Sequence, residues 1–177
     1  MAEAETAPGR IDTDRLVLVP LRVDHAHEMA EVLADPALYA FFAGAPPTAE
    51  IMRTRYAHLV AGSPDPAVSW CNWVVHLREA GCLTGFAQAI VTRSDQGSTA
   101  VVSLVTGRPW QGRGIGGEAA GGMLGWLRGQ GVDSVVADIH PDNRASAGAA
   151  ARSGFTRTGE VHGDKLRWRL RLSGSRS

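Results

Sequence analysis

The feature that most limits how this chain can fold is a run of glycines between a predicted strand at 99–106 and a predicted helix at 118–128. Glycine lets the backbone turn sharply and brings successive N–H groups close to a ligand. The start of a helix also carries unpaired N–H donors and about half a positive charge, so it attracts anions. The pattern therefore predicts a cradle of backbone N–H groups for a diphosphate at residues 112–117, with Arg113 adding a cationic side chain.

Other interpretations of this run are weaker. A phosphate-binding P-loop would end in Gly-Lys followed by Ser or Thr, and the run has no such ending. Gly112, Gly114 and Gly117 do have the spacing of a dinucleotide-binding fingerprint, with Asp138 at the end of the next predicted strand. However, residues 107–111 separate the first strand from these glycines, and too little chain follows Asp138 for a second βαβ half. A plain helix cap would need only one or two glycines.

The rest of the chain predicts strands and helices in mixed order. Predicted strands at 73–77, 83–91 and 99–106 are separated by short turns and indicate antiparallel hairpins. The glycine run, its helix and a buried strand at 134–139 add one crossover connection. We therefore expect an α/β fold with a mixed, mostly antiparallel central sheet of about six to seven strands and about four helices. The remaining strands are predicted at 15–20, 155–158 and 165–172, and the remaining helices at 24–33 (capped by Asp24), 48–60 (capped by Thr48) and 143–152.

Length and composition point to one globular domain. The chain has 177 residues, of which 44% are hydrophobic and 20% charged, so intrinsic disorder is excluded. We expect a domain at 11–172 with flexible tails at 1–10 and 173–177. The 18 basic and 18 acidic residues cancel. Without a basic excess to neutralise phosphates, the chain is not expected to bind nucleic acid.

Cysteine usage and hydropathy favour a cytoplasmic protein. Cys71 and Cys82 form neither a disulfide framework nor a metal-finger pattern, so two free thiols in a reducing compartment are expected. His25 and His27 have no third ligand nearby, and no metal is expected. Residues 1–10 lack the apolar stretch of a signal peptide, and no apolar run approaches the roughly 18 residues of a membrane span.

Several motifs together resemble one known family. The pattern Gln111-x-x-Gly114-x-Gly116 resembles the pyrophosphate-binding signature of the GNAT superfamily of acyl-CoA-dependent N-acetyltransferases. Residues 12–18 resemble the first strand of the branch that contains the ribosomal-protein alanine N-acetyltransferases. Further matches in that branch's order and spacing extend the resemblance over residues 11–172: Asp35-Pro36, residues 81–88, Asn143-Arg144-Ala145-Ser146 and Ser153-Gly154-Phe155.

The resemblance implies acetyl-CoA as the donor and an amine that attacks its thioester directly. It also implies two neighbouring parallel strands, ending at 104–106 and 138–140, that splay apart and hold CoA between them. Backbone groups at 104–106 would bind the pantetheine amides, and one N–H would stabilise the oxyanion. Asn143 would bind the pantetheine arm, and Arg152 would lie near the adenosine phosphates. The implied cofactor-binding residues are Leu104, Val105, Thr106, Gln111, Gly112, Arg113, Gly114, Ile115, Gly116, Gly117, Asn143, Ser146 and Arg152.

The resemblance leaves the catalytic groups less well defined. Many members of the family have a tyrosine as thiolate acid where this chain has Ala150. Ser146 matches a serine assigned that role in the ribosomal branch, although a serine there can equally satisfy a helix N–H. Free amines have pKa values near 10 and must lose a proton before attack. Glu160 and His162 are the predicted bases, unless orientation of the two substrates suffices. Further candidates are Glu79 and Asp164.

We therefore expect an N-acetyltransferase whose acceptor is a primary amine on a protein N-terminus or a small molecule. Two alternatives stay open. The glycine spacing permits a nicotinamide-dinucleotide-binding oxidoreductase, and Ala150 permits a CoA-binding module without catalysis. Tyr39, Phe41 and Phe42 follow the first predicted helix, where they belong either to the core or to the lining of the amine pocket. The resemblance is also compatible with a homodimer.

Overall fold

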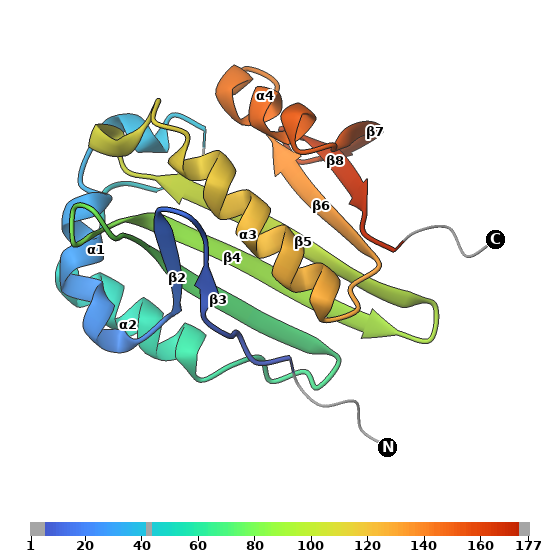
Figure 1. Ribbon diagram of the computed structural model, residues 1–177, viewed down its shortest axis with the longest axis horizontal. Coiled ribbons are helices and arrows are strands. Elements are labelled where there is room, and N and C mark those ends of the chain that lie inside the picture. Colours follow the sequence, from blue (N-terminus) through green and yellow to red (C-terminus); the bar gives the residue numbers. More distant parts are fainter. Residues whose placement is uncertain (1–5, 42–43, 174–177) are drawn as a thin grey trace.

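A single sheet dominates the computed structural model, which describes residues 6–41 and 44–173 (Figure 1). Within these ranges the sheet has eight strands in the order β1-β2-β3-β4-β5-β6-β8-β7. All neighbouring strands are antiparallel except β5 and β6, which confirms the predicted mixed sheet. The additional strand, β1, is too short for a periodic signal in sequence. The strands are β1 (Ile11–Asp12), β2 (Leu16–Pro20), β3 (Val68–Leu77), β4 (Cys82–Ser94), β5 (Gly97–Thr106), β6 (Ser134–Ile139), β7 (Thr156–His162) and β8 (Lys165–Arg171).

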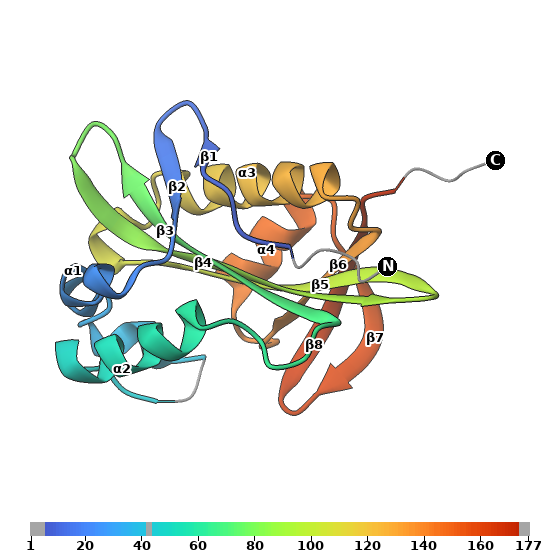
Figure 2. The same cartoon turned by 90° about the horizontal axis from the view of Figure 1, so that it is seen from below.

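Four α-helices cover the two faces of this sheet. They are α1 (Ala26–Val32), α2 (Ala49–Val60), α3 (Ile115–Gly129) and α4 (Arg144–Arg152), as counted within the described ranges. Figure 2 shows α3 on one side of the sheet and α1 and α2 on the other. Short 3₁₀ turns at Val23–His25, Pro36–Tyr39 and Arg108–Trp110 complete the connections.

A side-chain cap marks the start of α2 but not that of α1. The Thr48 hydroxyl accepts a hydrogen bond from the Ile51 N–H at 3.2 Å, as predicted for α2. Asp24 does not cap α1. Its carboxylate instead lies 3.0 Å from the Arg22 guanidinium, and the chain enters the helix through a 3₁₀ turn.

Alternation along the strands separates two hydrophobic clusters. On β3, the side chains of Cys71, Trp73 and Val75 belong to the larger cluster under α3. Val74, between them, points to the other face and packs in the smaller cluster with Met52 of α2. Successive side chains of a strand alternate in this way. One long strand therefore anchors helices on both sides of the sheet.

Part of the predicted N-terminal tail packs against the domain. Thr6 is buried, and its N–H donates to the Ser69 hydroxyl at 3.1 Å. The Trp73 indole donates to the Gly9 carbonyl at 2.8 Å. Residues 6–10 are therefore held against the sheet, where the sequence predicts a loose tail. The rest of that tail (1–5), residues 174–177 and Phe42 lie outside the described residues.

No helix among the described residues is long and apolar enough to span a bilayer. Cys71 is buried, and its thiol donates to the Thr6 carbonyl at 3.4 Å, whereas Cys82 is half-buried.

Candidate active site

The parallel strands β5 and β6 are paired only at their beginnings. Residues 99–101 of β5 pair with residues 134–136 of β6. Beyond Val101, β5 continues to Thr106 along β4, while β6 continues along β8. In the described chain, the edge of β5 from Val102 to Thr106 that faces β6 consequently has no strand partner. This confirms the predicted splayed pair.

The loop after β5 leads into α3 through two glycines in the left-handed region. Gly112 and Gly114 both have φ near +76°, which favours glycine at these positions. No side chain caps the helix at Gly114, and the Glu118 N–H is bonded to the Gly114 carbonyl at 3.1 Å. The N–H groups of residues 115–117 have no acceptor within the described ranges. The helix thus begins at Ile115, three residues before the predicted start, and half of the predicted cradle forms its first turn.

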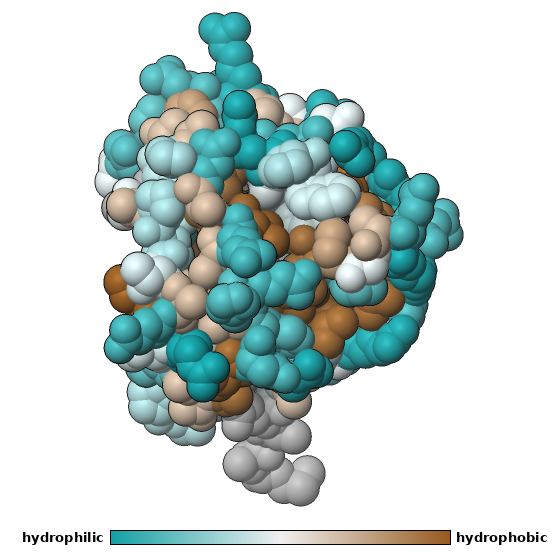
Figure 3. All heavy atoms as spheres, turned by 90° about the vertical axis from the view of Figure 1, so that its left-hand side faces the viewer, coloured by the Kyte–Doolittle hydropathy of each residue, from teal (hydrophilic) through white to brown (hydrophobic). Residues whose placement is uncertain are grey.

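Open space lies in front of this helix start. A Cβ atom built on Gly112 or Gly117 would meet nothing within 4 Å. Figure 3 faces the end of the molecule that carries this loop, where hydrophobic side chains gather at the centre and hydrophilic ones surround them. The uncapped N–H groups and the open space fit the diphosphate of CoA, and the unpaired edge of β5 fits its pantetheine arm.

Side chains of the loop fasten it to its surroundings. The Gln111 amide donates to the Thr106 carbonyl at 3.0 Å, which ties the loop to the last residue of β5. The Arg113 guanidinium lies over the Trp110 ring, 5.2 Å from its centroid. Gln111 therefore shapes the site with its side chain, and Arg113 stays exposed beside the helix start.

A residue from β1–β2 that the sequence did not single out also holds this loop. The Arg15 guanidinium contacts the Glu118 carboxylate at 2.8 Å and donates to the Arg113 carbonyl at 2.9 Å. Burial alone would raise the pKa of Glu118, but hydrogen bonds from Thr13 and Arg15 outweigh it and lower the pKa. Arg15 and Glu118 thus form an ion pair behind the loop. Residues 12–18 carried a family resemblance, but a single sequence gives no signal for this contact.

The start of α4 supplies the predicted pantetheine and acid residues. The Asn143 side-chain oxygen accepts the Ser146 N–H at 3.2 Å and caps the helix. The Ser146 hydroxyl is half-buried and bonds to no other described residue. Asn143 thus satisfies this helix N–H, and the role of Ser146 as thiolate acid stays a prediction. Arg152 is exposed in the last turn of α4, far along the helix from Asn143.

Glu160 and His162 lie on β7, next to an ion pair in the sheet. Arg167 of β8 binds the Asp138 carboxylate of β6 with two hydrogen bonds, at 2.8 and 3.0 Å. The Arg167 hydrogen bond, reinforced by the charges of His162 and Lys165, lowers the pKa of Asp138. Glu160 is exposed, 3.8 Å from the Arg169 guanidinium. The structure thus gathers these charged groups on one part of the sheet.

The end of β6 carries a histidine that the sequence analysis did not select. The His140 ring packs on Phe41, with centroids 5.4 Å apart, which joins β6 to the segment before α2. Its Nδ1 accepts the Asp142 N–H at 3.1 Å, and its Nε2 lies 3.7 Å from the Asp164 carboxylate. Asp164 is therefore next to this histidine. Glu79 lies exposed in the turn between β3 and β4.

The geometry weakens the dinucleotide interpretation and gives no metal site. The fingerprint would need the Asp138 carboxylate for a ribose, yet that carboxylate is bonded to Arg167. The sheet is also mostly antiparallel rather than doubly wound. Among the residues that the structure describes, no group of three or more His, Cys, Asp or Glu side chains could hold a metal ion.

Comparison with known protein families settles the class of enzyme. The model of the family described as "Acetyltransferase (GNAT) domain" matches residues 15–156. The chain therefore belongs to the GNAT family of acetyltransferases, which are acyl-CoA-dependent N-acetyltransferases with acetyl-CoA as donor. This confirms the predicted family, enzyme class and cofactor.

Solved structures of the same fold have low sequence identity to this chain. The ribosomal-protein-S5-alanine acetyltransferase from Vibrio fischeri has a TM-score of 0.79 and 18% identity, over 93% of this chain and 97% of that one. The acetyltransferase from Salmonella typhimurium that modifies the N-terminal serine of L7/L12 has a TM-score of 0.76 and 14% identity, over 93% of this chain and 100% of that one. The microcin C7 self-immunity acetyltransferase, solved with acetyl-CoA and AMP, has a TM-score of 0.76 and 15% identity, over 90% of this chain and 93% of that one. Comparison with curated protein sequences finds no match.

Proposed function

We propose that this acetyltransferase moves the acetyl group of acetyl-CoA to a primary amine by direct attack within a ternary complex. The observation that carries this proposal is the parting of β5 from β6 beyond Val101, beside the uncapped start of α3. The two features are close, because a Cβ on Gly116 would lie 3.3 Å from the Thr106 hydroxyl. One extended cofactor, with amides at one end and a diphosphate at the other, accounts for both features.

Each end of the cofactor has its own set of residues in this proposal. Backbone groups of residues 104–106 bind the pantetheine amides, as a partner strand would. The N–H groups of residues 112–117 and the Arg113 side chain bind the diphosphate. Gln111 supports the cradle through its bond to Thr106. Asn143 and Ser146 contact the pantetheine arm from the start of α4, and Arg152 lies toward the adenosine phosphates.

The reaction breaks one bond and forms another without an acyl-enzyme. The neutral amine nitrogen attacks the thioester carbon, and a backbone N–H of residues 104–106 stabilises the oxyanion that forms. The C–S bond then breaks, the thiolate takes a proton from Ser146, and the Ser146 hydroxyl regains a proton from the base that deprotonated the amine, directly or through water. Glu160 or His162 receives the proton that the amine loses, directly or through water.

The two cysteines support direct transfer. Cys71 is buried beneath α3, away from solvent. Burial, together with the charge of Glu28, raises the pKa of the Cys82 thiol, which keeps it protonated. A thiol must ionise to act as a nucleophile. Cys71 lies on β3 and Cys82 on β4, outside the two strands that hold the cofactor in this proposal.

The acceptor in this proposal is a protein N-terminus or a small-molecule amine. Two structural neighbours are described as acting on ribosomal proteins, one on an alanine and one on an N-terminal serine. Their fold is shared over nearly the whole of both chains, which makes a peptide acceptor reasonable.

An acetylation assay tests the proposal. The enzyme is incubated with acetyl-CoA and a panel of peptides and small amines. CoA release is followed with a thiol reagent, and the masses of the products are measured by mass spectrometry. We expect an acetylated amine and one equivalent of CoA. In parallel, CoA should raise the melting temperature and NADH should not. Stabilisation by NADH alone would overturn the proposal, and tight CoA binding without turnover on any amine would indicate a binding module.

A further inference from the structure

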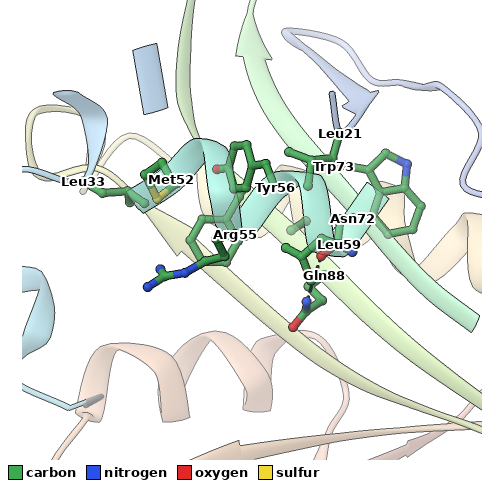
Figure 4. Close-up of a pocket in the computed structure, with 11 residues that line it drawn as sticks. Leu21, Leu33, Met52, Arg55, Tyr56, Leu59, Asn72, Trp73 and Gln88 are labelled. Atoms are coloured by element: carbon green, nitrogen blue, oxygen red, sulfur yellow. Dashed lines mark hydrogen bonds between the residues drawn. The ribbon is translucent and has the colours of Figure 1, made fainter. Parts of the chain in front are cut away.

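A pocket lies between α2 and the face of the sheet formed by β3 and β4 (Figure 4). Its volume is about 260 Å³. A cavity of roughly 150 Å³ already holds a benzene ring. Apolar side chains form most of the wall, among them Leu33, Met52, Leu59 and Phe86. This space, which we name the α2 pocket, is therefore large enough for a ring or a branched chain.

The Tyr56 hydroxyl is a polar group of the α2 pocket that no described side chain engages. Tyr56 is only 5% exposed, and its hydroxyl bonds to no other described residue. Every fully enclosed side-chain N or O atom of the described chain does have a partner, so this hydroxyl must reach open space. Burial raises the pKa of Tyr56, which keeps the phenol a neutral donor. An accessible hydroxyl that no side chain engages can donate to an acceptor atom of a ligand in the pocket.

A pair of amides forms the polar part of the floor. The Gln88 amide donates to the Asn72 side-chain oxygen at 2.8 Å, as drawn in Figure 4, and Asn72 is 8% exposed. A primary amide has two donor hydrogens and an oxygen with two lone pairs. One bond between Asn72 and Gln88 leaves hydrogen-bonding capacity on both. The floor can therefore bind a peptide-like group while the walls enclose an apolar one.

The α2 pocket adjoins the proposed reaction centre through β4. Gln88 is the cross-strand partner of Ser103, and Phe86 is the partner of Val105. Directly paired residues lie about 5 Å apart and point to the same face. Ser103 and Val105 belong to the stretch of β5 that has separated from β6. An amine that attacks a thioester held at this stretch of β5, as the proposed function requires, would therefore lie next to the wall of the pocket.

The charges around the α2 pocket disfavour the binding of amines that carry several positive charges. None of the described residues that line it is acidic, and Arg55 is at its margin. A second ammonium group on the acceptor would meet this guanidinium without a compensating carboxylate. Polyamines and aminoglycosides, which carry several ammonium groups, are therefore poor occupants, whereas a carbonyl or carboxylate near Arg55 is favourable.

We propose that the α2 pocket binds the apolar side group of the acceptor, so that the enzyme prefers amines carrying an aromatic or branched apolar group beside a carbonyl. This rests on the proposed function, because it assigns a substrate class to the same site. The Tyr56 hydroxyl and the amides of Asn72 and Gln88 bind the polar part of that acceptor. Leu59 and Phe86 enclose its side group.

Amino-acid amides that differ only in the side chain test this preference. The kcat/KM values for alanine, leucine and phenylalanine amides are compared, with spermidine as the polycationic control. Burying a large apolar side chain is expected to raise kcat/KM on the order of 10- to 100-fold over alanine amide. Spermidine should be poorer than any of the three. Equal rates across the series, or a preference for alanine amide or spermidine, would overturn the assignment.

A substitution that fills the pocket separates side-chain binding from catalysis. Leu59→Trp should lower the phenylalanine-to-alanine ratio of kcat/KM at least tenfold. Val60→Trp is the matched control, because Val60 is 52% exposed and does not line the pocket. That control should leave the ratio unchanged, and both variants should bind CoA with unaltered Kd. An unchanged ratio in folded Leu59→Trp would contradict the proposal.

A binding measurement keeps this test distinct from that of the proposed function. If no amine were acetylated, the proposed function would fail. Calorimetry with N-acetylphenylalanine amide and the enzyme–CoA complex would then show whether the α2 pocket binds an apolar side group. Binding that is weakened by Leu59→Trp and not by Val60→Trp would support it. Absence of binding would overturn it.

Discussion

Gly85 of β4 allows the end of β5, which we propose binds the pantetheine, to pack closely against β4. It pairs with Thr106, and a Cβ atom added to it would lie 2.0 Å from the Val105 carbonyl oxygen. Real Cβ contacts essentially never fall below 3.0 Å. Gly85→Ala must therefore push the backbone of Val105 away by about 1 Å. That backbone is the proposed partner of the pantetheine.

This displacement should affect both the stability and the activity of the enzyme. Overpacking of a tight contact costs roughly 1–3 kcal/mol. For a chain of this length, each kcal/mol lowers the melting temperature by roughly 2–4 °C. A misplacement of about 1 Å at a reaction centre can reduce the rate about 100-fold. We therefore expect Gly85→Ala to lower kcat/KM by about 100-fold while the enzyme stays folded at the assay temperature.

Steady-state kinetics below the melting temperature tests this expectation. The kcat/KM for acetyl-CoA is measured with one fixed amine, and circular dichroism confirms that the variant is folded. Gly125→Ala is the matched control: its Cβ would meet nothing within 4 Å on the exposed side of α3, and alanine favours a helix. The control should keep full activity and gain a little stability. A folded Gly85→Ala enzyme with unchanged kcat/KM would refute the proposed role of residues 104–106.

Three further results are expected. Gly114→Glu should abolish CoA binding in calorimetry, because it places an anion at the diphosphate cradle and a side chain at positive φ; unchanged affinity would contradict the cradle. Ser146→Ala should lower kcat more than it raises KM, and equal effects would reduce Ser146 to a binding contact. The pKa of Asp138 is lowered in the folded state, so its pairing with Arg167 stabilises the fold above the unfolded pKa of about 3.8 and is lost as pH falls below it. In urea unfolding, Asp138→Asn should therefore be less stable than the parent at pH 7, with a difference that shrinks toward pH 2; a constant difference would refute this linkage.

Sequence reasoning succeeded where the signal is local. Hydrophobic alternation located β3 to β6, and Thr48 marked the start of α2 to the residue. The glycine run indicated a sharp turn before α3, and Gly112 and Gly114 both have positive φ. The anion cradle at this turn stays a prediction. Family motifs then added the acetyl-CoA donor, which the matching family model confirms.

Contacts between distant segments were decided only by the tertiary structure. Arg15 reaches Glu118 and the Arg113 carbonyl because β2 lies beside the start of α3, and no periodicity encodes that approach. Asp24 has the character of a helix cap, but Arg22 is close enough to bind its carboxylate instead. His140 meets Phe41 for the same kind of reason.

The sequence by itself thus determined which segments become strands and helices and where the chain turns sharply before α3. The tertiary structure decided how far β5 and β6 stay together, which charges lie behind the loop, and how large a space remains under α2. The physical reason is that capping, turn formation and alternation depend on neighbours in the chain. Strand separation and pocket volume depend on how side chains from several elements fill one space.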